Sequence, residues 1–591
     1  MRYRLSHALR LVIALVFLIF MVPFLLSKLD SNSNQSAISN KEDDFAQHQL
    51  PKEERVDNDA HPKTNSLQPR MSSSLGNYEP KNVSTRTGPG EGGVPVILSP
   101  AEEQAAQKTI SQYGFNMVAS DKISMDRNIK DTRPAECKNW IYPEVQNLPT
   151  ASVILVFYDE GWSVLLRTVH SVIKTSPKEL LKDIILIDDG SSDPDLKERL
   201  EKYIERWNGL VKLYRTGKRV GLIAARTLGA EKSTGDVIIV LDAHCECVIN
   251  WLPPLLTRIA LNRKALAVPI VDGLEWKTLE HTNIYGSSNF RGIWEWGFLY
   301  KETEVPEQEL KKRKYSSEPY WSPTHAGGLL AIDRQWFFEL GAYDPGIRVW
   351  GAEQYELSFK VWQCGGVVEW VPCSHVAHAY RGPRSHSSHV PGASPYQTAI
   401  NHMRLAEVWM DEYAEYYYIR EPAIRTLNYG DISERKQLRT KLQCKPFKWF
   451  MENIAYDVLQ KFPPPPKNVV WGECKNIKHS VCLNDRGASF GQPIGVSGCY
   501  RQSVWRLNEG GEISSGEHCF ISDHEIVKKK FCLDHNGQWN PLGEWQYDKA
   551  IKQIRSNKEH LCMESNGNDL KLSKCDETNQ AQQWEWTEIH Y

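Results

Sequence analysis

Several features that would mark particular classes of protein are missing from this 591-residue chain. No cysteine precedes Cys137, although the chain has 13, so thiol chemistry belongs to the later, folded part. Positive charge is not in excess, because 71 Lys and Arg oppose 73 Asp and Glu. The formal charge of −2 gives no global electrostatic reason to expect nucleic-acid binding. Cys-x-x-Cys spacing is also absent, which argues against a zinc cluster.

Long apolar runs are equally scarce, and the one that stands out lies near the N-terminus. Leu11–Ser27 is uncharged and follows Arg2, Arg4 and Arg10. Its length approaches that of a membrane helix, and basic residues on its N-terminal side place that end in the cytosol. We predict a cytosolic tail at residues 1–10, a single-pass anchor at 11–27 and a luminal body. A cleaved signal peptide is the alternative, but Phe24–Lys28 offers no small-residue cleavage site.

A luminal body has two consequences for the rest of the chain. Disulfides are expected there, and Asn34 and Asn82 stand in Asn-x-Ser sequences that could carry glycans. Residues 28–93 are rich in Ser, Asn, Lys, Glu, Pro and Gly with few clustered apolar residues. Such a stretch buries too little surface to offset its ordering entropy, so we predict a flexible stem and a packed domain from Val94.

Four apolar runs after Pro149 predict β-strands that alternate with helices. The strands are expected at residues 151–158, 183–189, 210–214 and 236–242, and the helices at 162–174, 193–206 and 221–232. Continuous apolar runs are typical of strands covered on both faces. The β-α-β-α-β-α-β order therefore predicts an α/β domain with a mostly parallel sheet and helices on both faces.

Acidic residues end two of these strands. Asp189 ends the second strand and Asp242 ends the fourth, and ligands of open parallel sheets bind beyond such strand ends. Asp242 and His244 are two residues apart, and a carboxylate with an imidazole suits Mn²⁺ or Mg²⁺, with the imidazole favouring Mn²⁺. Alone this tripeptide is more typical of a solvated loop. Together with Asp189 it indicates a nucleotide-sugar site.

After the proline run at residues 463–466 the chain contains a degenerate repeat. Cys482, Cys532 and Cys562 each begin a similar short sequence, at spacings that suggest a three-fold β repeat. Tryptophans near these repeats are more often part of the core than of a sugar site.

Seven longer motifs follow one another along the chain: LRTVHSV at 166–172, LDAHCE at 241–246, AGGLL at 326–330, WGAEQ at 350–354, VWQCGG at 361–366, VPCSH at 371–375 and AEVWMDE at 406–412. With these motifs in this order, the chain from Val94 onwards resembles the polypeptide N-acetylgalactosaminyltransferases, luminal enzymes that start mucin-type O-glycosylation. The resemblance implies a GT-A nucleotide-diphospho-sugar transferase domain at 94–460, a linker at 461–468 and an all-β ricin-type β-trefoil lectin domain at 469–591. It also implies Mn²⁺, the donor UDP-GalNAc, Ser/Thr acceptors on polypeptides or glycopeptides, retention at the anomeric carbon, and a type II location in the Golgi membrane.

The same resemblance implies roles for individual residues. The metal ligands are Asp242, His244 and His378. Trp350, Glu353 and Arg381 hold the sugar and pyrophosphate or place the acceptor, with Arg381 offsetting charge on the UDP leaving group. The donor-binding set also includes Val156, Asp189 and Arg219, and, in the loop after Arg381, Arg384 and His386. We expect same-face attack with Glu353 as the nearest carboxylate, and the departing phosphate oxygen as proton acceptor; a double displacement would need a carboxylate nucleophile.

Some positions depart from the family pattern. Tyr158 replaces a usual His, Gly190 replaces an aromatic residue, and Val220 and Ala224 replace a Glu and an Arg. These changes leave open a second hypothesis, a luminal lectin-like protein with a weak or inactive catalytic half. A GT-A transferase that uses another donor sugar is a third, minor one.

The trefoil and the cysteines complete the expectations. Asp534 is the best preserved sugar-binding position, with Asn484 and Glu564 in the matching places of the first and third copies. One sugar site is therefore expected rather than three. The resemblance implies the disulfides Cys137–Cys373, Cys364–Cys444, Cys482–Cys499 and Cys562–Cys575, and leaves Cys519 and Cys532 as a further candidate pair.

Overall fold

The computed structural model describes residues 67–80, 86–286, 288–383, 390–500, 503–533 and 543–591. The predicted tail and anchor and both potential glycosylation sites lie outside these residues. Within the described ranges, none of the helices combines the length and the apolar character needed to cross a bilayer.

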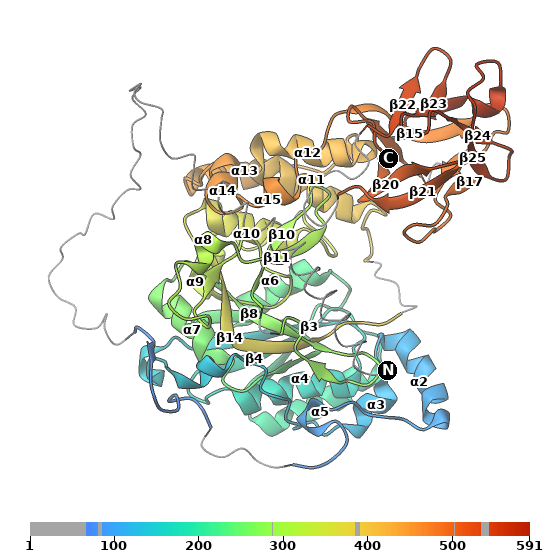
Figure 1. The fold of residues 1–591 in the computed structure, drawn as a ribbon. Helices are drawn as coiled ribbons and strands as arrows, with labels where there is room; N and C mark the ends of the chain where they lie inside the picture. The colour runs from blue at the N-terminus through green and yellow to red at the C-terminus, as the bar shows by residue number, and fades with distance from the viewer. Residues whose placement is uncertain (1–66, 81–85, 287, 384–389, 501–502, 534–542) are drawn as a thin grey trace, which may run out of the picture. The chain divides into compact units, whose positions relative to one another are not determined.

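A ten-stranded sheet forms the centre of the catalytic domain (Figure 1). Its strands β6 (Val237–Asp242), β3 (Ala151–Phe157), β4 (Leu181–Asp188) and β5 (Val211–Arg215) are parallel neighbours in that order. The four predicted strands are therefore confirmed, with ends shifted by one or two residues.

Antiparallel strands extend this parallel group. Strand β13 (Leu330–Asp333) lies between β6 and β8 (Ala265–Leu274) and is antiparallel to both, whereas β14 (Val367–Ala379) is parallel to β8. The sheet is thus mixed, with the predicted parallel half at one side. The short strands β7 (Cys245–Cys247), β9 (His281–Thr282) and β12 (Tyr320–Trp321) complete it.

Both faces of the sheet are buried in separate apolar cores. Successive side chains of a strand point to opposite faces, so Ile154 of β3 packs in the same core as α6 (Leu222–Lys232), and its neighbour Val153 packs with α4 (Trp162–Thr175). The continuous apolar runs follow from this two-sided burial.

The prediction of one continuous helix at 193–206 is wrong. It is divided into 3₁₀ turns at Pro194–Leu196 and Glu205–Trp207 and a short helix, α5 (Glu198–Ile204). The break is at Lys197, whose φ of −98° and ψ of −120° are not helical. The Lys197 ammonium forms an ion pair with Asp188 at 3.5 Å.

The other elements of the domain are helices and one hairpin. The hairpin consists of β10 (Phe290–Trp294) and β11 (Tyr300–Glu304). The helices are α2 (Pro100–Tyr113), α3 (Met117–Lys122), α7 (Leu252–Leu261), α8 (Glu307–Leu310), α9 (Arg334–Glu339), α10 (Glu353–Gln363), α11 (Gln397–Trp409), α12 (Ala414–Arg420), α13 (Ser433–Lys441), α14 (Phe447–Asn453) and α15 (Val458–Lys461).

Part of the predicted stem belongs to the catalytic domain, which corrects the boundary at residue 93. Strand β1 (Arg70–Met71) pairs with β2 (Trp140–Ile141). The Tyr78 hydroxyl donates to the Pro143 carbonyl at 2.7 Å, and Glu79 forms an ion pair with Arg133 at 2.8 Å. Composition did not reveal this segment because backbone pairing and polar contacts hold it in place.

Five disulfides cross-link the chain. They are Cys137–Cys373, Cys364–Cys444, Cys482–Cys499, Cys519–Cys532 and Cys562–Cys575. Cys519–Cys532 is the pair that the sequence left open, and the other four are the pairs that the family resemblance implied. Cys245, Cys247 and Cys474 are buried free thiols.

The described part of the C-terminal domain consists of β-strands and one 3₁₀ turn, Gln580–Gln582, and has an internal three-fold pattern. Trp505, Trp545 and Trp584 are buried, and their indole N–H groups donate to the carbonyls of Leu483, Phe520 and Met563 at 2.7 to 2.9 Å. Its strands are β15 (Asn468–Asn476), β16 (Cys482–Asn484), β17 (Gly495–Ser497), β18 (Trp505–Asn508), β19 (Ile513–Ser515), β20 (His518–Asp523), β21 (Ile526–Phe531), β22 (Trp545–Asp548), β23 (Gln553–Ser556), β24 (Cys562–Ser565), β25 (Leu570–Ser573) and β26 (Trp584–Thr587).

This pattern corrects the register predicted for the repeats. The residue whose carbonyl accepts from each tryptophan follows Cys482, Cys519 or Cys562, so the middle copy begins at Cys519 rather than Cys532. Cys532 is the disulfide partner that closes that copy. Asp534 therefore does not correspond to Asn484 and Glu564, and it lies outside the described residues. The corresponding residue of the middle copy is Ile521, which has no polar side chain.

One carboxyl group is buried in the trefoil without a full set of partners. Glu512 is fully buried, and its Oε2 accepts from the Asn508 side-chain amide at 2.6 Å while Oε1 has no hydrogen-bond partner. Burial raises the pKa of Glu512 to about 7, although the Asn508 hydrogen bond and the charge of Arg506 act in the opposite direction. Because the folded state holds this proton more tightly than the unfolded state, stability falls as the pH rises from about 4.5 to 7.

The first prediction is that Glu512→Gln relieves this penalty. At pH 8 the variant is expected to raise the free energy of unfolding of the trefoil by about 2 kcal/mol, and at pH 4.5 by close to zero. Calorimetric unfolding of the chain from residue 67 onwards at both pH values measures the difference, with the exposed neighbour variant Glu509→Gln as control. Equal shifts at pH 4.5 and pH 8 would contradict the role given to ionisation.

Candidate active site

Acidic residues lie at the ends of three adjacent parallel strands. Glu160 follows β3, Asp189 follows β4 and Asp242 ends β6. Val156 of β3 is paired with Asp242 in the strand register, which places it at the same edge. The sequence predicted Val156, Asp189 and Asp242 as site residues and missed Glu160.

Asp242, His244 and His378 come together as the sequence predicted. One ligand atom from each lies within 4.8 Å of the others, and His378 Nε2 is 3.2 Å from Asp242 Oδ2. The pairing of β7 with β14, in which Cys245 lies opposite His378, brings His244 to its partner. Burial acts to raise the pKa of Asp242, but its hydrogen bond to His378 and the charge of Arg226 lower that pKa well below its ordinary value.

Glu160 contacts two of the predicted site residues, Arg381 and His244. Its Oε2 accepts from Arg381 Nη2 at 2.7 Å and is 3.1 Å from His244 Nδ1. Although burial acts to raise the pKa of Glu160, the charges of Arg381 and His244 lower it to about 2, so the group is a carboxylate. A proton on His244 Nδ1 shared with Glu160 leaves Nε2 of that ring free to bind a cation.

Arg381 is fixed by the same cluster. Its Nη1 donates to the Tyr113 carbonyl at 2.5 Å, and its guanidinium lies 4.6 Å from the ring centre of Phe115. Burial, and next the Arg381 charge, lower the pKa of His244. The neutral form of the imidazole is the form that binds metals.

Arg226, which was not predicted from the sequence, connects Asp242 with Glu353 through its buried guanidinium. Arg226 on α6 lies 3.2 Å from Asp242 Oδ1 and 3.5 Å from Glu353 Oε1. Gly328 allows this approach, because a Cβ on that residue would lie 2.5 Å from both Arg226 Nη2 and Asp242 Oδ1. Gly328, the second glycine of the AGGLL motif, is therefore required because any side chain there would collide with Arg226 and Asp242.

Trp350 and Glu353 are carried by a backbone of unusual conformation. Val349, Gly351 and Ala352 all have positive φ, at 66°, 95° and 79°. The Gly351 N–H donates to Glu353 Oε2 at 2.9 Å, so both oxygens of that carboxylate have partners, and Trp350 is 59% exposed.

Asn401 on α11 stabilises this loop. Its side chain is fully buried and its amide donates to the carbonyls of Arg348, Trp350 and Gly351, at 2.7, 3.1 and 3.1 Å. Its Oδ1 accepts from the Arg348 N–H at 3.0 Å. Since non-glycine residues with positive φ persist only where their surroundings hold them, Asn401 sets the position of Trp350.

The predicted uridine residues form a second cluster. Asp189 accepts from the backbone N–H groups of Val220 and Gly221 at 2.7 and 2.9 Å, which fixes the turn that carries Arg219. Burial raises the pKa of Asp189. The Arg219 guanidinium lies 3.6 Å from the ring centre of Tyr158, and its Nε and Nη1 have no hydrogen-bond partner among the described residues.

The departures from the family pattern leave these contacts intact. A Cβ on Gly190 would lie 2.7 Å from the backbone nitrogen of Arg219. The absence of a side chain at Gly190 therefore lets the turn that carries Arg219 pack against it. Val220 contributes its backbone, which any residue supplies. Ala224 is exposed on α6, whereas Arg226 is the residue of that helix that contacts Asp242. Arg384 and His386 lie outside the described residues.

Two of the trefoil residues named as candidate sugar ligands, Asn484 and Glu564, already have hydrogen-bond partners within the domain. The Asn484 amide donates to Ser503 Oγ at 3.0 Å, and Glu564 Oε2 accepts from the Gln582 amide at 2.9 Å.

Family comparisons agree with both domains. Residues 152–337 match the family described as glycosyl transferase family 2, residues 310–383 match the N-terminal domain of galactosyltransferase, and residues 470–584 match the ricin-type beta-trefoil lectin domain.

Comparisons with single proteins cover most of the chain. It is 48% identical to the probable N-acetylgalactosaminyltransferase 7 of Caenorhabditis elegans, over 88% of this chain and 86% of that protein. It is 41% identical to human polypeptide N-acetylgalactosaminyltransferase 10, over 84% and 83%. A crystal structure of GalNAc-T7 with UDP, GalNAc and Mn²⁺ is 42% identical, with a TM-score of 0.83 over 88% of this chain and 97% of that one. On this evidence the chain belongs to the polypeptide N-acetylgalactosaminyltransferase family.

Proposed function

We propose that this protein transfers GalNAc from UDP-GalNAc to Ser or Thr hydroxyls of polypeptides or glycopeptides, with retention at the anomeric carbon. The observation that carries the proposal is the cluster of Asp242, His244 and His378 beside Arg381 and Glu353. The related GalNAc-T7 structure contains UDP, GalNAc and Mn²⁺ and is 42% identical to this chain over 88% of its length.

Mn²⁺ is the proposed cofactor, and the residues present suit it. An ionised carboxylate and two imidazoles, one held neutral by burial and by Arg381, form a donor set that binds such a cation. When bound, the cation offsets negative charge on the diphosphate.

The chain's own residues bind the donor and stabilise the leaving group. We infer that Arg381, oriented by Glu160, faces the pyrophosphate, where a fixed guanidinium stabilises charge without needing to reorganise. Arg219, whose Nε and Nη1 have no hydrogen-bond partner among the described residues, and Asp189, which forms an ion pair with Nε at 3.8 Å, hold the uridine end. Val156 lines the same strand edge.

Glu353 is best explained as a group that positions the sugar rather than as a nucleophile. One of its oxygens is occupied by Arg226 and the other by the Gly351 N–H, and a double displacement would need a free carboxylate oxygen near the anomeric carbon. This supports same-face attack by the acceptor hydroxyl, with the departing phosphate oxygen taking its proton. Trp350, exposed at the edge of the site, is placed to contact the acceptor.

Asp242, His244 and His378 lie together, whereas Asn484 and Glu564 of the trefoil already have hydrogen-bond partners, and this supports the enzyme over a lectin-like protein. We also propose that the enzyme is a type II protein of the Golgi membrane, anchored by residues 11–27. The support is the uncharged run with basic residues on its N-terminal side.

The decisive test is a transfer assay with UDP-GalNAc, Mn²⁺ and mucin-like peptides that are either bare or already carry GalNAc. Asp242→Asn is expected to lower transfer at least 100-fold, because it removes the charged ligand. The exposed variant Asp195→Asn should match the unaltered protein. An unaltered protein that is inert with every acceptor and binds GalNAc without binding UDP and Mn²⁺ would instead select the lectin-like hypothesis.

Glu160→Gln tests how His244 is oriented. The variant loses the charged acceptor for both His244 and Arg381, so Mn²⁺ affinity is expected to fall about 10- to 100-fold. Titration of Mn²⁺ followed by calorimetry measures this, with the exposed variant Glu144→Gln as control. Unchanged Mn²⁺ affinity would show that Glu160 does not act through the metal ligand.

Asn401→Asp tests the positioning of Trp350. The change keeps the Oδ1 acceptor but removes the amide donor to three carbonyls, so kcat is expected to fall about 10- to 100-fold while affinity for UDP and Mn²⁺ stays within twofold. The exposed variant Asn453→Asp is the matched control. A loss of thermal stability with kcat unchanged would reduce Asn401 to a purely structural residue.

A further inference from the structure

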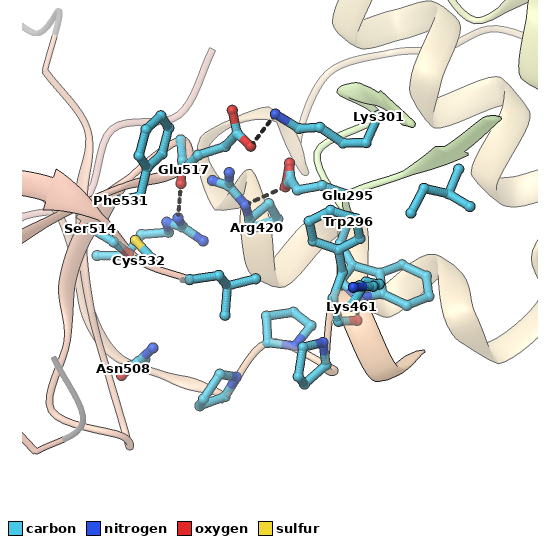
Figure 2. A pocket seen from close by; sticks show the side chains of 18 of the residues that line it. Glu295, Trp296, Lys301, Arg420, Lys461, Asn508, Ser514, Glu517, Phe531 and Cys532 are labelled. Atoms are coloured by element: carbon cyan, nitrogen blue, oxygen red, sulfur yellow. Dashed lines mark hydrogen bonds and ion pairs between the residues drawn. The ribbon is translucent and has the colours of Figure 1, made fainter. Parts of the chain in front are cut away.

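A cavity of about 420 Å³ lies between the catalytic domain and the trefoil (Figure 2). The β10–β11 hairpin, the segment after α15 and residues of β18 and β19 line it. Lys301 of the hairpin and Glu517 of the trefoil form an ion pair at its edge. The donor site does not share these residues, so the cavity is a separate feature of the molecule.

Two buried arginines face this cavity, one from each domain. Arg420, 7% exposed, ends α12, and Arg506, 6% exposed, lies in β18. The positive charge of Arg420 contributes, after burial, to lowering the pKa of Arg506 to about 9. The charges of Glu421, Glu295 and Glu512 act in the opposite direction but do not restore the pKa of Arg506 to its ordinary value. Like charges buried at one cavity are costly unless anions compensate them.

The compensation within the chain is incomplete. Arg420 Nε donates to Glu295 Oε1 at 2.7 Å, but its Nη1 is buried with no hydrogen-bond partner among the described residues. The nearest carboxylate oxygen recorded for that nitrogen is in Glu421, at 3.7 Å.

Arg506 has still weaker partners. Its two terminal nitrogens donate only to backbone carbonyls, those of Ile419 at 3.4 Å and Gly516 at 3.3 Å. Within the described part of the chain no carboxylate approaches it within 4.0 Å. A guanidinium is most strongly stabilised by a carboxylate in the plane of its donors, and here that position is left to a ligand.

The other charged groups at the cavity already have partners or add positive charge. Lys301 is paired with Glu517 at 2.5 Å, and Glu302 accepts from the hydroxyls of Tyr285 and Tyr300 at 2.7 and 3.2 Å. Lys461 also lines the cavity and makes no ion pair within the described residues. Glu295 accepts from Arg420 through Oε1, but its Oε2 is buried with no hydrogen-bond partner among the described residues. The net charge of the lining is nevertheless positive, because four cationic residues stand against three carboxylates: Lys301, Arg420, Lys461 and Arg506 against Glu295, Glu302 and Glu517.

The remaining walls and the size indicate an organic ligand. A cavity of this volume falls within the range of small-molecule sites. Three carboxylates at its walls, Glu295, Glu302 and Glu517, would repel a dianion such as phosphate more strongly than a monoanion. Apolar side chains also line the cavity, among them Trp296, Phe462, Pro463, Pro465, Pro466 and Leu533.

We propose that this cavity binds a small monocarboxylate with an apolar body, whose carboxylate lies between Arg506 and Arg420. The ligand would touch both domains at once, so its binding would favour one arrangement of the trefoil relative to the catalytic domain. This site is independent of GalNAc transfer, and its test does not use transfer activity.

Benzoate and its neutral isostere benzamide are suitable probes. Calorimetry on the luminal chain, with UDP and Mn²⁺ present to occupy the donor site, should show benzoate binding at least tenfold tighter than benzamide. Equal concentrations of inorganic phosphate should not displace benzoate. Equal affinity for the two probes, displacement by phosphate, or no binding of benzoate at millimolar concentration would overturn the proposal.

A pair of variants and a crystal soak locate the site. Arg506→Met should weaken benzoate binding at least tenfold, whereas the exposed trefoil variant Arg555→Met should stay within twofold of the unaltered chain. Because Arg506→Met could disturb folding, crystals of the unaltered chain soaked with p-bromobenzoate provide an independent measurement. An anomalous bromine peak between Trp296 and Arg506 is expected, and a peak only elsewhere would overturn the assignment.

Discussion

The contact on which the site depends is the bridge that Arg226 makes between Asp242 and Glu353. One buried guanidinium contacts a residue at the end of a central strand and a residue at the start of α10. Removing one partner of a buried ion pair costs about 3–5 kcal/mol because the other charge is left uncompensated. The bridge therefore holds Asp242 ionised and places Glu353 at the same time, and Gly328 is the residue that lets the guanidinium reach both.

Local patterns were sufficient to predict the parallel half of the sheet. Strands buried on both faces give continuous apolar runs, and the two-sided cores around Ile154 and Val153 explain why these runs were clear. Antiparallel β13 was not predicted, because its run of four residues carries too little periodicity. Asp189 and Asp242 were found at strand ends. Glu160 follows the strand between theirs, so the same rule would have found it too.

Contacts that join distant segments could not be read from the sequence alone. Asn401 bonds to a loop some 50 residues earlier, and nothing in the local pattern of α11 distinguishes it from a helix-surface amide. The trefoil register was misread for a related reason. The Cys-Leu-Asp sequence at Cys532 imitates the start of the first copy, Cys-Leu-Asn at Cys482, whereas the true equivalence depends on which carbonyl each buried tryptophan reaches and on which cysteine closes each copy.

Helix α11 connects the loop of Trp350 with the trefoil. Asn401 supports the loop from within this helix, and Tyr396, the residue before the helix, stacks on the ring of Tyr591 with a centroid distance of 4.6 Å. The backbone N–H of Tyr591 in turn donates to the Ala423 carbonyl of the catalytic domain at 3.1 Å. A displacement of the last trefoil strand would thus act on the start of the helix that holds the loop. Because positive φ angles at Val349 and Ala352 are kept only by such support, the geometry of the Trp350 loop depends on both domains. The cluster of Asp242, His244 and His378 instead depends on contacts within the catalytic domain, those of the sheet strands, Glu160 and Arg226.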